Sequence, residues 1–133
     1  MMRYKRVPTV ILLTVIVSIA TVGASCHREH LSPERIVGKL VINGACGNYV
    51  IQVISGKIAP SRYLASWSNG DTTYTNVFTV RDRCHFGQNG VKQNQKFSFL
   101  LSDTAVVQTC MVCDIYVAVP NVSNWITDVQ PMP

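Results

Sequence analysis

The 133-residue sequence predicts an all-β domain, a small barrel or sandwich of five to six strands, after an N-terminal signal helix. Three observations lead to this prediction. Short runs of β-branched and aromatic residues recur at fairly regular spacing, turn signals separate them, and no long helical period interrupts them. The length suits one domain, and charged residues, at 14%, are too few for a disordered polyelectrolyte or a coiled coil.

The first strands are expected as a hairpin. Two β-branched runs, residues 36–42 and 49–54, flank residues 43–48, which are rich in Gly and Asn and indicate a longer loop. A third strand over residues 62–67 leads into the strong turn signal Asn69-Gly70, and residues 72–80 form another β-rich run.

The second half of the chain is expected to add two more strands. Residues 87–95 contain Gly and Asn and predict a loop. Residues 96–101 then place large apolar side chains on one face at period two, and residues 113–119 repeat this alternation as the last strand. Residues 121–133 are expected to form an irregular tail, in which residues 124–129 could make one helical turn.

The N-terminal residues have the layout of a secretory signal. Residues 3–6 are basic, residues 7–24 carry no charge, and small residues follow. The sequence therefore divides into a signal peptide, a polar tether, a β-domain and the irregular tail, over residues 1–25, 26–35, 36–120 and 121–133.

The end of the signal segment resembles a bacterial lipobox. The residues that carry the resemblance are Gly23-Ala24-Ser25-Cys26, although the usual aliphatic residue three places before the Cys is Gly23 here. This resemblance implies lipidation of Cys26. Cleavage after Ala24 without lipid and an uncleaved anchor are the alternatives, and each of the three places the domain outside the cytoplasm. With the tether, β-domain and cysteines, the chain resembles small lipoproteins of bacterial envelopes; its resemblance to OB-fold-like barrels is architectural only.

The cysteine count agrees with lipidation. Five cysteines in an exported protein leave one over, and a lipid on Cys26 would leave Cys46, Cys84, Cys110 and Cys113 to form two disulfides. The sequence does not choose among the three possible pairings. Cys110 and Cys113 also have the spacing of a redox pair, but they lead into a strand-like run rather than a helix, which favours structural bridges. Zinc ligation is disfavoured because Cys46 and Cys84 are 38 residues apart, rather than the close pair typical of structural zinc.

Aromatic and arginine side chains are the candidate ligand-binding residues. Trp67 and Tyr74, with Tyr63 and Trp125, could form an aromatic platform for a glycan or a peptide, or could flank the core. Arg81 and Arg83 could bind an anionic group as bidentate donors, or could lie on a solvated strand end.

Several functional classes are disfavoured by the sequence. Three of the twelve basic residues and no acid lie in residues 1–25, so the remaining nine basic and seven acidic residues give no nucleic-acid signal. Hydrolase and phosphate-loop motifs are missing, so we expect no enzyme, no cofactor and no metal. Cleavage after Ala24 would leave Ser25-Cys26-His27, which could chelate Cu(II), although an incidental His27 is the simpler interpretation.

Three functional hypotheses remain. The leading one is a non-enzymatic, lipid-anchored β-domain with a structural or interaction role at the cell envelope, contacting the membrane through its lipid and an envelope protein or glycan. The second is a secreted glycan- or peptide-binding module that uses Trp67, Tyr74, Arg81 and Arg83. The third is a thiol-disulfide oxidoreductase that uses Cys110 and Cys113.

Overall fold

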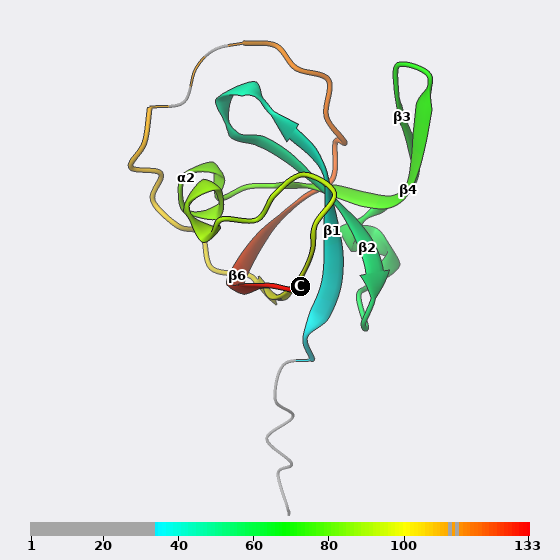
Figure 1. Cartoon of the computed structure of the whole chain (residues 1–133), viewed down its shortest axis with the longest axis horizontal. Coiled ribbons are helices and arrows are strands. Elements are labelled where there is room, and N and C mark those ends of the chain that lie inside the picture. The colour runs from blue at the N-terminus through cyan, green and yellow to red at the C-terminus, as the bar shows by residue number, and fades with distance from the viewer. Residues whose placement is uncertain (1–33, 112, 114) are drawn as a thin grey trace, which may run out of the picture. The chain divides into compact units, whose positions relative to one another are not determined.

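A computed structural model describes residues 34–133 with the exception of residues 112 and 114. Its strands are followed here by their labels in Figure 1: β1 (Ile36–Gly44), β2 (Asn48–Ser55), β3 (Leu64–Asn69), β4 (Thr72–Val80), β5 (Lys96–Ser102) and β6 (Ser123–Pro131). The helical turns are η1 (Ala45–Gly47), η2 (Pro60–Arg62), α2 (Arg83–Phe86) and η3 (Gly87–Asn89). In this part of the chain no helix is long and apolar enough to cross a membrane.

Five strands close into a barrel, which confirms the predicted all-β class. The sheet runs β2-β1-β5-β6-β4-β3, and an additional pairing of β2 with β4 closes the ring. Only the β4–β6 pair is parallel. β3 lies outside the ring and extends from it as a hairpin with β4 (Figure 1). Closure removes most of the sheet edges that would otherwise expose unpaired backbone groups.

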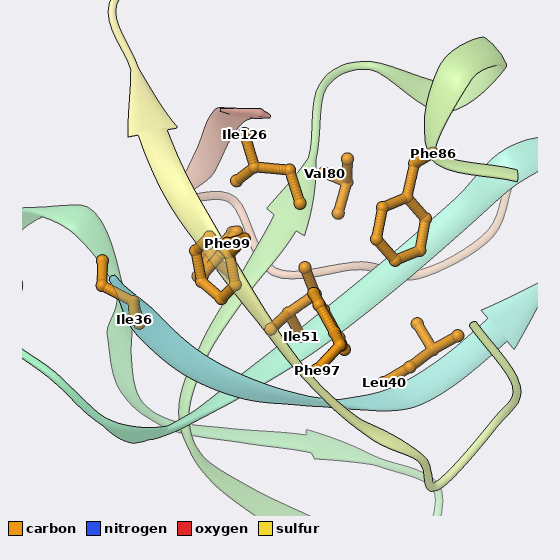
Figure 2. Close-up of a cluster of buried hydrophobic side chains, with 9 residues drawn as sticks. Ile36, Leu40, Ile51, Val80, Phe86, Phe97, Phe99 and Ile126 are labelled. Atoms are coloured by element: carbon orange, nitrogen blue, oxygen red, sulfur yellow. The ribbon is translucent and has the colours of Figure 1, made fainter. Parts of the chain in front are cut away.

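Alternation along the strands fills the barrel. Nine buried side chains form the main core, and Figure 2 shows eight of them by name, converging from β1, β2, β4, α2, β5 and β6. Phe97 and Phe99, two residues apart on β5, are fully buried and contact each other at 5.5 Å between ring centroids. Phe86 from α2 closes one end of this core, 5.6 Å from Phe97. The short helix therefore belongs to the core and is fixed by it.

β1 passes through the most crowded part of the barrel at Gly38. This residue pairs with Val53 of β2 and with Phe97 of β5. A Cβ atom at this position would lie 2.7 Å from Ile51 and 2.9 Å from Phe99, closer than packed carbon atoms approach. Only glycine fits this position without displacing the core.

The last strand is not where the sequence placed it. The described residues of 113–119 form no strand, whereas β6 covers most of the predicted irregular tail. β6 pairs with β5 from Phe97–Pro131 to Ser102–Trp125, and it buries Asn124 and Ile126. The prolines misled the prediction: Pro120 and Pro133 lie outside β6, and Pro131 ends it.

Two further expectations need correction. The predicted tether ends at residue 35, but Arg35 belongs to the barrel, because its guanidinium bonds Ser98 of β5 and Asp128 of β6. Residues 83–86 form a helical turn and not a strand end. Asp82 explains this turn, because its carboxylate accepts from the backbone N–H of His85 at 3.1 Å and caps the helix.

Candidate functional site

The segment between β5 and β6, residues 103–122, is fastened to the barrel by two disulfides. We call it the tethered segment. Cys46 of η1 bonds Cys113, and Cys84 of α2 bonds Cys110, with Cα–Cα distances of 5.4 and 5.5 Å. This pairing is one of the three that the sequence left open. The bridges fix the middle of the segment to two different parts of the barrel.

The disulfide pairing bears on the redox hypothesis. Cys110 and Cys113 are bonded to different partners and not to each other. A CxxC oxidoreductase cycles through a bond between its own two cysteines. The arrangement in this structure is a pair of structural bridges instead.

Hydrogen bonds hold the tethered segment at further points. The Gln108 side chain accepts from the backbone N–H of Arg83 at 3.0 Å and donates to Asp82 at 3.3 Å. Near the other end, the Thr79 hydroxyl donates to the carbonyl of Pro120 at 2.9 Å. The segment is therefore held to the barrel at several positions, although its described residues form neither helix nor strand.

The tethered segment carries a group of exposed apolar side chains, which we call the tethered surface. Its members are Val107, Met111, Ile115 and Tyr116, with exposed fractions of 79%, 97%, 59% and 95%. They are four of the six exposed large hydrophobic residues in the described chain. Figure 1 shows the described parts of the segment outside the barrel, on the side of α2 and, further along, beside the start of β6. Exposed large apolar side chains on one segment make it a candidate interaction surface.

A second candidate site is a polar cleft beside the start of β6. It has a volume of about 310 Å³, and its lining comes from η2, the residue after β4, the end of β5, both ends of the tethered segment, and β6. Its chemically distinctive residues are Arg62, Arg81, Asp103, Ser123 and Trp125. The cleft therefore combines cations, hydroxyl groups and an aromatic ring.

A third hollow, of about 300 Å³, lies beside His85. The Asp82 carboxylate, which is buried, contacts His85 Nδ1 at 2.9 and 3.0 Å and so orients the ring. Asp128 lies on the same hollow, and its hydrogen bond to Arg35, followed by that to Gln130, lowers its pKa below the ordinary value of 3.8. Because Asp82 also caps α2 and binds Gln108, its contacts are explained by the architecture. Within residues 34–133, apart from 112 and 114, no three His, Cys, Asp or Glu residues gather as metal ligands.

The predicted ligand-binding residues do not form one site. Trp67 and Tyr74 stack on the β3–β4 hairpin with centroids 6.0 Å apart, and both pack against a small cluster of buried valines. Arg81 lines the polar cleft, whereas Arg83 lines a different hollow beside Cys113 and Tyr116. The proposed lipidation site, Cys26, lies outside the described residues.

Sequence reasoning missed the partners that surround Arg81. Arg62 and Asp103 form an ion pair although they are 41 positions apart, and no local sequence pattern predicts this pair. Trp125 was noticed only as a member of the aromatic platform, and the tail in which it was placed is a strand. Comparison of the chain with protein-family models, curated proteins and solved structures found no match.

Proposed function

We propose that this protein is a non-enzymatic interaction domain, anchored at the cell envelope by a lipid on Cys26, that binds another envelope protein through the tethered surface. The basic and apolar N-terminal residues support export, as does the odd cysteine count. Two disulfides in so small a domain are typical of proteins that fold in oxidising compartments.

The observation that carries this proposal is the exposure of the four apolar side chains on a segment held by disulfides. A connection of twenty residues whose described positions form neither helix nor strand is unusually long for a compact domain, and such loops are commonly functional. Tyr and Met are enriched at the centres of protein interfaces. Because bridges, Gln108 and Pro120 already fix the segment, a partner would lose less affinity to ordering it.

The position of the tethered segment also supports a binding role. In OB-like barrels, the loops that join the first to the second and the fourth to the fifth barrel strands contribute to the ligand surface. Here those loops are η1 and the tethered segment, and Cys46–Cys113 joins them. The segment has two Asp and no Lys or Arg, so it lacks the cations that a nucleic-acid backbone requires. A protein partner fits its apolar side chains better.

Site-specific photo-crosslinking in intact cells tests this proposal. A photoreactive phenylalanine analogue replaces Tyr116, which is 95% exposed, and in a matched control replaces Ile54, which is 45% exposed on β2. We expect one discrete crosslinked protein from position 116 and none from position 54. Equal crosslinking from both positions would show non-specific contact and would contradict the proposal.

A binding measurement with the crosslinked partner completes the test. Tyr116→Ser should weaken the complex by about 2 kcal/mol or more if Tyr116 is a central contact. The melting temperature should stay unchanged, because the side chain makes little contact with the barrel. Loss of stability with unchanged affinity would assign Tyr116 to the fold instead.

A further inference from the structure

Arg81 is the cation of the polar cleft that has no ion-pair partner in the described part of the chain. Its Nε donates to the Ser123 hydroxyl at 2.8 Å, and its backbone N–H donates to the carbonyl of Asn124 at 2.9 Å. Among the described residues, no carboxylate lies within ion-pair distance of its guanidinium. The hydrogen bond at Nε orients the group, so its two terminal nitrogens can serve an external anion as a fork.

Arg62, in contrast, is already paired and firmly placed. Its Nη2 bonds the carboxylate of Asp103, which is 85% exposed. Its carbonyl accepts from the side chain of Asn124 at 2.7 Å, and Asn124 is only 2% exposed. This partly buried hydrogen bond fastens η2 to β6, so the wall of the cleft is formed before any ligand binds. The Arg62–Asp103 pair presents donors beside acceptors, an arrangement that suits hydroxyl groups.

Trp125 adds a partly buried aromatic side chain to the same cleft. Asn124 and Ile126 point into the barrel, so Ser123 and Trp125 share the opposite face of β6. Trp125 is paired with Ser102 at the end of β5, which fixes its position beside the exposed Asp103. An indole offers a large apolar surface on which the C–H groups of a sugar ring can pack.

We propose that the polar cleft binds an acidic sugar unit, a hexose bearing a carboxylate or a sulfate. The anion contacts Arg81, the sugar hydroxyls contact the Arg62–Asp103 pair, and the ring packs against Trp125. A volume of about 310 Å³ suits one such unit and is at the small end of ligand pockets. The site shares no residue with the tethered surface, so this inference and the proposed function can fail separately.

Saturation-transfer NMR on the intact protein, purified from its own cells, measures this binding directly. The probes are methyl glucuronide, glucose 6-sulfate and the neutral methyl glucoside. We expect an acidic sugar to bind about tenfold more tightly than the neutral one, because a hydrogen bond to a charged group stabilises a complex more than a neutral hydrogen bond does. The two acidic probes identify which anion the cleft prefers.

Two variants locate the binding. Arg81→Gln should weaken the acidic sugar at least about tenfold and leave methyl glucoside unchanged, because only the charge-assisted contacts are lost. Arg83→Gln is the matched control, since Arg83 lines a different hollow, and it should leave the affinity for the acidic sugar unchanged. Tyr116→Ser should likewise leave sugar binding unchanged.

Three results would overturn the inference. Methyl glucoside could bind as tightly as the acidic sugars, which would show that the anionic group does not contribute to the affinity. Arg81→Gln could retain the affinity of the unaltered protein, which would place the sugar elsewhere. Inorganic sulfate, titrated alone, could bind as tightly as glucose 6-sulfate, which would reduce the cleft to a general anion site.

Discussion

At the scale of single residues, Arg35 joins three strands. Arg35 is the residue directly before β1. Its guanidinium donates to the Ser98 hydroxyl of β5 at 3.1 and 3.2 Å and to the carbonyl of Asp128 in β6 at 2.6 Å. It also forms an ion pair with the Asp128 carboxylate. Asp128 has a positive φ of 50°, a conformation that few residues other than glycine adopt. The arginine therefore stabilises an unusual backbone position in β6.

This contact predicts a pH dependence. Hydrogen bonds from Arg35 and then Gln130 lower the pKa of Asp128 in the folded protein below its ordinary 3.8. A carboxyl group whose folded pKa is lowered contributes stability above its unfolded pKa and loses it as the pH falls through the folded pKa. Arg35→Gln should raise the pKa of Asp128 toward 3.8, which carboxyl NMR titration measures. The same substitution should remove the contribution of Asp128 to stability above its unfolded pKa.

Gln130→Ala is the comparison for this titration. Gln130 donates to Asp128 Oδ1 at 3.1 Å and has the smaller effect, so its removal should raise the pKa of Asp128 less than Arg35→Gln does. A larger rise of the Asp128 pKa in the Gln130→Ala protein would contradict the conclusion that Arg35 lowers this pKa more than Gln130 does. The sequence could not have predicted this network, because Arg35 and Asp128 are 93 positions apart.

At the scale of elements, β6 yields a prediction that separates it from the strand expected at residues 113–119. Ile126 is 5% exposed in the barrel, whereas Ile115 is 59% exposed on the tethered segment. Ile126→Ala should lower the free energy of unfolding by about 2–5 kcal/mol, because it leaves a cavity in the core. Ile115→Ala should change it by less than about 0.5 kcal/mol.

Chemical denaturation of both variants measures the two effects. Equal losses at the two positions would contradict the assignment of β6 and return residues 113–119 to the core. Both substitutions remove the same atoms from the same residue type, so the difference reports burial alone.

The sequence predicted the elements whose partners are near in the chain or whose pattern is strong. The run at residues 72–80 matches β4 in full, and the alternation of Phe97 and Phe99 correctly identified a core face of β5. Residues 113–119 alternate just as clearly but form no strand, because β5 pairs with β6 instead. Alternation of apolar and polar residues cannot reveal which of two segments pairs with the edge of a given strand.

The short helix and the candidate sites were harder to predict for related reasons. A helix of four residues is too short to show a period, and only the cap at Asp82 signals α2. Arg81 was identified as a candidate for anion binding, and it does line a cleft with exposed hydrogen-bond donors. Its neighbours Arg62 and Trp125 come from distant segments that only the closed barrel brings together.

At the scale of the whole molecule, the two disulfides are expected to supply much of the stability. Cys46 and Cys113 are 67 positions apart, so opening this bridge frees a large loop in the unfolded chain. Cys46→Ala with Cys113→Ala should lower the free energy of unfolding by about 4 kcal/mol on the chain-entropy model, a large share of the roughly 5–15 kcal/mol of a typical domain.

Denaturation with and without a reducing agent provides the control. Once both bridges are reduced, the variant and the unaltered protein should unfold at nearly the same denaturant concentration. A difference that persists in reductant would mean that the cysteines contribute through packing rather than through the bond.

The mature form of the molecule is also predictable. Intact mass spectrometry of the protein from its own membrane fraction should give a chain that begins at Cys26 with added acyl groups. Reduction should add four hydrogens, two for each bridge. A chain that begins at Ser25 without lipid would contradict the anchored form and would make the possible Cu(II) site at Ser25-Cys26-His27 worth testing.

The order of the cysteines has a consequence for biosynthesis. In the sequence, the bond Cys46–Cys113 encloses the bond Cys84–Cys110. Cys46 and the next of these four cysteines, Cys84, are therefore not native partners. If export proceeds from the signal segment toward the C-terminus, Cys46 and Cys84 meet the oxidising compartment together before Cys113 emerges. A premature bond between them must be exchanged by thiol attack before the barrel can close. Efficient maturation should therefore require a disulfide isomerase as well as an oxidase, and a host without the isomerase should accumulate the misbridged chain.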